Sequence, residues 1–188
     1  MVTTSGTWSA RHSVQAMAER TAALINALSC DDPRPAAVAA VLRAHGETND
    51  ATDTGRLVER DVVEMRAAAE QLRTVFEARD VDAAAECLNA LLPRSTGVLR
   101  LTSHRGASPW HPHLDGDDEA PWGEWLLASS CLALTVLLWD RQRPPGAVCA
   151  SSSCANVFLT AGSGPERRYC SRRCATRERV AAHRRAHG

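Results

Sequence analysis

CASSSC at residues 149–154 and CSRRC at residues 170–174 are the two segments that decide how the C-terminal part of this chain folds. Each supplies two thiols from one short turn. The fifteen-residue gap between them holds the strand-like VFL at 157–159 and a glycine-rich turn at 162–165, so the chain can fold back on itself. Four thiolates gathered in this way typically form a tetrahedral site, and we predict that Zn²⁺ is bound by Cys149, Cys154, Cys170 and Cys174. A metal-free or redox-sensitive site is the alternative.

A helix is predicted to begin at the second cysteine pair and to run to about Ala186, where the i, i+4 spacing places Cys170 and Cys174 on one face. Arg172, Thr176, Arg179 and His183 then lie on the opposite face. A helix that exposes Arg and His suits a DNA major groove, because Arg pairs with guanine and also binds phosphates. Arg177, on the inward side, is expected to brace the cysteine turn or to reach a phosphate. The candidate DNA-binding residues are Arg167, Arg168, Arg172, Arg173, Thr176, Arg177, Arg179, His183, Arg184 and Arg185.

The charge of the chain is divided between two ends. From Arg141 onward there are ten arginines and two glutamates, a formal charge of +8, whereas the whole chain is neutral, so residues 1–140 carry −8. A basic end on an acidic body favours binding of a polyanion such as DNA. A charged tail that is merely solvated is the alternative. Every basic residue is Arg, which is typical of a GC-rich bacterial genome and weakens any argument from arginine chemistry alone.

The first 92 residues are rich in alanine and predict helices near 11–29, 35–45, 56–79 and 81–92, with an exposed loop at 47–55. Two short strands around a turn at 103–109 predict a small hairpin. Pro121 then opens a long apolar helix to about Trp139, a candidate for the central buried helix. The expected fold class is mainly α: a helical N-terminal domain with a small β-hairpin over 1–143, then a treble-clef or ribbon-like zinc finger with a helix over 144–188.

The segment from Cys149 to His187 resembles the CGNR zinc finger, whose naming string reads Cys174-Ala175-Thr176-Arg177 here, with the cysteine and the arginine matching. The upstream residues are similar to the helical ABATE-type domain of bacterial stress-induced transcription regulators. The matching pieces are Leu24-Ile25-Asn26, the segment WHPH at 110–113, and Pro121-Trp122 with Trp125-Leu126. This resemblance implies a bacterial DNA-binding regulator and carries over the four zinc ligands.

A second group of chemically active residues surrounds the predicted hairpin. Trp110, His111, His113 and Trp122 are candidates to line a small-ligand pocket. His111 and His113, followed by aspartates at 115, 117 and 118, also permit a second metal site, since imidazole and carboxylate are ordinary ligands and alternating residues on a strand share a face. The simplest interpretation remains that these are hairpin and turn residues that pack against the tryptophans.

We expect no catalytic activity, because the chain has no phosphate-binding loop, nucleophile elbow or HExxH string, and a four-cysteine zinc ion has no open coordination position.

A cytoplasmic location is expected, since no signal peptide is evident and the apolar run 125–139 is shorter than the ~20 residues of a membrane span. The expected partner is DNA. Because one finger reads only a few base pairs, we expect an assembly in which a homodimer, a second contact surface or a partner protein adds specificity. Two other functions stay open: an adaptor that docks on an acidic protein such as RNA polymerase, and a zinc–thiolate redox switch.

Overall fold

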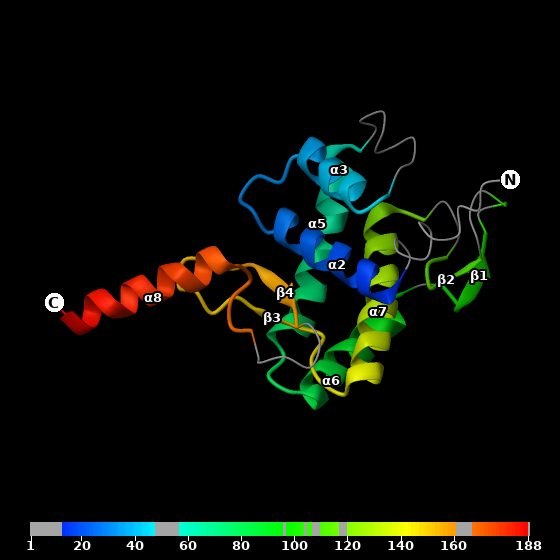
Figure 1. The fold of residues 1–188 in the computed structure, drawn as a ribbon. Coiled ribbons are helices and arrows are strands. Elements are labelled where there is room, and N and C mark those ends of the chain that lie inside the picture. The colour runs from blue at the N-terminus through cyan, green and yellow to red at the C-terminus, as the bar shows by residue number, and fades with distance from the viewer. Residues whose placement is uncertain are drawn as a thin grey trace, which may run out of the picture.

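The computed structural model describes residues 13–47, 57–95, 97–103, 105–106, 110–116, 120–160 and 167–187. Within them the elements are α2 (Val14–Leu28), α3 (Pro35–Ala44), α5 (Glu59–Glu77), α6 (Val81–Leu91), the 3₁₀ turn η1 (Leu92–Arg94), β1 (Arg100–Thr102), β2 (His111–His113), α7 (Trp122–Arg141), β3 (Gly146–Val148), β4 (Val157–Leu159) and α8 (Arg172–His187). The mainly helical class, the small hairpin and the C-terminal cysteine cluster with its helix are confirmed (Figure 1).

The central helix of the body is α7, which packs against α5, α2 and α6. Leu126, Cys131 and Leu134 on α7 are fully buried, as the apolar sequence of this helix predicts. Among the described residues, α7 is the one helix long and apolar enough to cross a membrane, by length and composition only. Its packing against three neighbouring helices is what the core helix of a globular body requires.

The hairpin of β3 and β4 packs directly on the helical body. The two strands are antiparallel, with Gly146 opposite Leu159 and Val148 opposite Val157. Val157 and Leu159 belong to the same buried cluster as Phe76 of α5. Gly146 has to be a glycine, because a Cβ there would lie 2.4 Å from Cδ1 of Phe76. The strands that carry the first cysteine pair are therefore held by the core of the body, while the boundary expected at residue 143/144 stays a prediction.

The expected starts at residues 35 and 81 are confirmed, and the other helix ends differ from the expected ones by one to three residues. Ser13 caps α2 by accepting a hydrogen bond from the Ala16 N–H at 3.1 Å, and Asp80 caps α6 in the same way through Ala83 at 2.8 Å. The predicted start of the third helix at residue 56 was too early, because Asp61 binds the Val58 N–H and α5 begins only at Glu59. Instead of stopping near Trp139, α7 continues to Arg141, where Gln142 adopts the left-handed conformation that ends a helix. The expected loop at 47–55 lies outside the described residues except for Glu47.

The hairpin of β1 and β2 lies on the opposite side of the body from α8 (Figure 1). Its register pairs Arg100 with His113 and Thr102 with His111. Contacts of β2 with α7 attach the hairpin to the body. The two strands expected around a turn are confirmed, although most of the turn at 103–109 is outside the described residues.

Candidate metal centre

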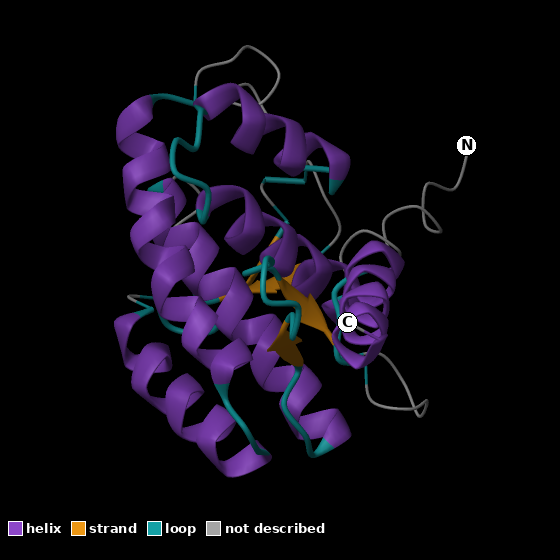
Figure 2. Ribbon diagram, turned by 90° about the vertical axis from the view of Figure 1, so that its left-hand side faces the viewer, coloured by secondary structure: helices purple, strands orange, loops and turns teal. Residues whose placement is uncertain are grey.

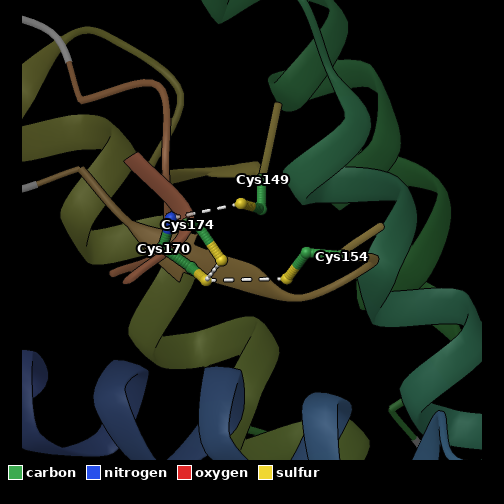
Figure 3. A group of neighbouring side chains, drawn as sticks. All are labelled: Cys149, Cys154, Cys170 and Cys174. Atoms are coloured by element: carbon green, nitrogen blue, oxygen red, sulfur yellow. Dashed lines mark hydrogen bonds between the residues drawn. The ribbon is translucent and has the colours of Figure 1, made fainter. Parts of the chain in front are cut away.

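The four cysteines predicted as ligands come together at one point. Cys149 follows β3, Cys154 lies in the turn before β4, Cys170 precedes α8 and Cys174 lies in its first turn. Their sulfur atoms all lie within 4.8 Å of one another and point toward a common centre (Figure 3). The Cys170 sulfur lies 3.7 Å from the sulfurs of both Cys154 and Cys174.

These separations fit a metal ion better than a disulfide. A sulfur–sulfur bond is about 2.05 Å long, and all seven cysteines of the chain are free. Four sulfurs at about 2.3 Å from a tetrahedral metal ion would be about 3.8 Å apart, close to the observed 3.7 Å. The cluster can therefore hold a metal ion as four thiolates.

The second pair reaches this geometry in a different way from the one predicted. Cys170 is not on the helix, because α8 begins only at Arg172. Ser171 lies just before the helix, and its hydroxyl accepts the N–H of Cys174 at 3.3 Å, as an N-cap does. The same serine lowers the pKa of the Cys174 thiol to about 7, whereas burial raises the pKa of the Cys170 thiol to about 12, so without a metal ion the charge of the cluster lies on Cys174. The turn before the helix, and not i, i+4 spacing along it, brings the two sulfurs together.

Backbone hydrogen bonds join the two cysteine turns. The Cys170 N–H donates to the Cys149 sulfur at 3.4 Å, and the Ala150 N–H donates to the carbonyl of Arg168 at 2.8 Å. A peptide N–H directed at a thiolate stabilises its negative charge. These two hydrogen bonds therefore hold the turn of Cys170 and Cys174 beside the turn of Cys149 and Cys154.

Arg177 and Glu178 of α8 hold the loop between Cys149 and Cys154. The Arg177 guanidinium donates to the Ser151 hydroxyl at 2.8 Å and to the Cys174 sulfur at 3.4 Å. The Ser151 hydroxyl in turn donates to the Glu178 carboxylate at 2.7 Å, and the Ser152 N–H reaches the same oxygen at 3.1 Å. These bonds lower the pKa of Glu178, with Ser151 the main cause. The bracing role expected for Arg177 agrees with these contacts.

The other candidate DNA-binding residues fall into two groups. Arg167 and Arg168 precede α8 and are exposed; Arg167 donates to the Cys170 carbonyl at 2.8 Å and lies over the Phe158 ring. Arg168 lies over the ring of Tyr169. The remaining residues are exposed along α8, and they are Arg172, Arg173, Thr176, Arg179, His183, Arg184 and Arg185.

Helix α8 extends away from the body (Figure 1), and in the view turned by 90° it is seen nearly end-on (Figure 2). Of its sixteen residues only Cys174 is buried. Six arginines and one glutamate give it a strongly positive surface over its whole length. A helix that is polar on all sides either stays solvated or binds a partner.

The residues proposed for a ligand pocket are spread over the β1–β2 hairpin and the start of α7. Trp110 is 72% exposed, whereas Trp122 packs edge-on against Trp125 with 5.2 Å between ring centroids. His111 and His113 contact each other at 3.0 Å, and His113 contacts Asp115. The ligand pocket stays a prediction.

Sequence reasoning missed the residues that support the centre from outside the cysteine pairs. Ser151 and Glu178 carry no spacing signal of their own. Asn26 enters the sequence analysis only as part of the segment similar to the ABATE-type domain, yet its side chain binds the backbone of Val157 beside the centre. It also lines a cavity of about 520 Å³ next to the cysteines, together with Arg173 and Arg177.

The class of protein module that this hairpin, helix and four-cysteine cluster define is a zinc finger. Residues 147–187 match the family model of the CGNR zinc finger, and the match includes all four cysteines and the whole of α8. The family resemblance predicted for this segment is thereby confirmed. No curated protein matches the chain.

Proposed function

We propose that this protein is a bacterial transcription regulator that binds Zn²⁺ through its four cysteines and DNA through α8. The observation that carries the proposal is the exposed, arginine-rich helix that begins at the metal centre. A sixteen-residue helix is about 24 Å long and, with side chains, about 10–12 Å wide, which suits a major groove about 12 Å across.

Zinc is the metal we propose, because four thiolates at tetrahedral spacing form a closed structural site. Such a site contributes about 10–16 kcal/mol to the folding of small zinc-finger peptides. Here the metal ion would fix Cys174, and with it the first turn of α8, against the hairpin. A closed site of this kind has no position for a substrate, which supports a role other than catalysis.

The helical body is proposed to sense a ligand, to dimerise or to contact the transcription machinery, all in the cytoplasm. A second recognition surface is required because a single finger contacts only about three base pairs. The acidic body would also be repelled by DNA, which would orient the basic helix toward it.

The test is to measure, by fluorescence anisotropy at several salt concentrations, how tightly the zinc-loaded full chain binds a labelled DNA duplex of mixed sequence. We expect the affinity for DNA to fall as salt rises. The double variant Arg172→Ala with Arg179→Ala should bind more weakly, and the slope of log K against log[salt] should be smaller in magnitude by about 2, because two phosphate contacts are lost. Point substitutions are preferable to removal of the finger, because Val157 and Leu159 are part of the core of the body.

The matched control is Arg60→Ala with Arg79→Ala, which removes the same charge from side chains that are 86% and 90% exposed on the body. It should leave the slope unchanged. Equal effects of the two pairs would mean that net charge and not α8 governs binding. Zinc-loaded protein with no DNA affinity would reject the proposal and favour an adaptor that docks on an acidic protein.

A further inference from the structure

Two histidines of the β1–β2 hairpin present their Nε2 atoms to each other. His111 and His113 alternate with the exposed Pro112 on β2, so both point to the same face of the hairpin. Their Nε2 atoms are 3.0 Å apart, and the rings meet at 65°. Two ring nitrogens that carry lone pairs repel at this distance unless a proton or a metal ion lies between them.

Asp115 orients one member of the pair. Its carboxylate contacts Nδ1 of His113 at 2.8 and 2.9 Å. Asp115 is only 3% exposed, and the His113 side chain is 13% exposed. A carboxylate that accepts the Nδ1–H places the lone pair of the imidazole on Nε2 and makes it a better donor, the arrangement found behind metal-bound histidines.

The distance between the nitrogens matches a chelate. With metal–nitrogen bonds of about 2.0–2.1 Å, two imidazole nitrogens are about 2.9 Å apart at a right angle and about 3.3 Å apart in a tetrahedron. The observed 3.0 Å lies within this range.

The charges around the pair select the kind of metal ion. Arg100, opposite His113 on β1, donates to Asp115 at 3.0 Å and neutralises its carboxylate. Calcium and magnesium ions depend on carboxylate oxygens and gain little here. Nickel, zinc and copper ions bind well to neutral imidazole.

We propose that His111 and His113 form a second metal site, which chelates one divalent transition-metal ion through both Nε2 atoms, with Asp115 as a positioning residue. Water completes the coordination. The hairpin lies across the body from α8 (Figure 1), so this site is separate from the four-cysteine centre, and its test needs no DNA.

The experiment is titration calorimetry of Ni²⁺ into the zinc-loaded full chain. A second histidine pair on α8, His183 and His187, has ring centroids 4.2 Å apart and is also able to bind nickel. The starting protein therefore carries His183→Ala and His187→Ala. Zinc content before and after the titration shows whether nickel has displaced zinc from the cysteines.

We expect one Ni²⁺ per chain in this background, lost in His111→Ala, and no binding of Mg²⁺ or Ca²⁺. Asp115→Asn should weaken nickel binding about 10–100-fold. The control is His12→Ala, which removes an imidazole outside the hairpin and outside the described residues. This variant should bind nickel as tightly as the starting protein does.

Unchanged nickel binding in both His111→Ala and His113→Ala, each with the thermal midpoint of the parent, would overturn the proposal. The absence of nickel binding in the starting protein would also overturn the proposal, since His111 and His113 would then share only a proton. Because His111 is only partly buried, His111→Ala is expected to fold, and near-ultraviolet circular dichroism of each variant verifies this.

Discussion

The side chain of Asn26 forms two hydrogen bonds with the backbone of Val157. Its amide nitrogen donates to the Val157 carbonyl at 3.0 Å, and its amide oxygen accepts the Val157 N–H at 2.8 Å. Asn26 thus takes the place of a neighbouring strand along the edge of β4. One side chain of α2 thereby holds the hairpin that carries the first cysteine pair.

Asn26→Ala should destabilise the protein by about 2–4 kcal/mol, because it leaves a partly buried N–H and carbonyl without their partner. Urea unfolding of the zinc-loaded protein measures this. Asn89→Ala, at an exposed position of α6, is the control and should change stability by less than about 0.5 kcal/mol. Equal stabilities of the two variants would show that the amide pair contributes nothing.

Arg177→Ala should accelerate zinc loss to a coloured chelator by about 10–100-fold, because Arg177 links the Cys174 sulfur to Ser151. Arg179→Ala, two positions further along, removes an arginine whose described bond is to Thr176 and should retain zinc normally. In DNA binding the order should reverse, with zinc-loaded Arg177→Ala less affected than Arg179→Ala. Similar zinc loss from both would contradict the bracing role.

Gly146→Ala should destabilise the protein by about 1–3 kcal/mol, because the added Cβ would lie 2.4 Å from Phe76 and 2.5 Å from the Phe158 carbonyl. Phe76→Leu relieves the first clash only. A double-mutant cycle by urea unfolding should therefore give a favourable coupling between the two changes. Strict additivity would mean that the contact with α5 does not restrict residue 146.

Acid should destabilise the protein partly through His45. Burial lowers the pKa of this imidazole below 6.5, and the charge of Arg20 lowers it further. The unfolded chain therefore binds the proton more tightly than the folded chain does. The stability that depends on a neutral His45 is fully present above pH ~6.5, and it is lost as the pH falls from that value toward the folded-state pKa. His45→Gln should remove this component.

The comparison is the urea midpoint of parent and His45→Gln at about pH 7.5 and pH 5.5. Protonation of the cysteines affects both proteins alike, so the difference between them isolates His45. His183→Gln, at an exposed position on α8, should behave as the parent does. A parent and a His45→Gln variant that lose equal stability would contradict the assignment.

The family of the C-terminal segment and the gathering of its four cysteines were predictable from sequence, because residue type and spacing are local properties. The central helix α7 was predictable for a similar reason, since a run of apolar residues has to be buried wherever the chain places it. The start of α8 was wrong by two residues, because its cap depends on Ser171, whose hydroxyl competes with helix formation at Cys170.

Composition and spacing alone determined that this chain is mainly helical, that its C-terminal part is a cysteine-rich finger and that its charge is divided between two ends. The tertiary structure decided that the finger hairpin is held by the body through Asn26, that Ser151 and Glu178 join Arg177 in bracing the cysteine loop, and that the Nε2 atoms of His111 and His113 meet. The first two relationships join residues that are 26, 27 or 131 positions apart, and the third depends on the side-chain torsion angles of the two histidines. Sequence periodicity placed His111 and His113 on one face of a strand, but it carries no information about the distant pairs, since only packing of the whole chain brings those within hydrogen-bonding distance.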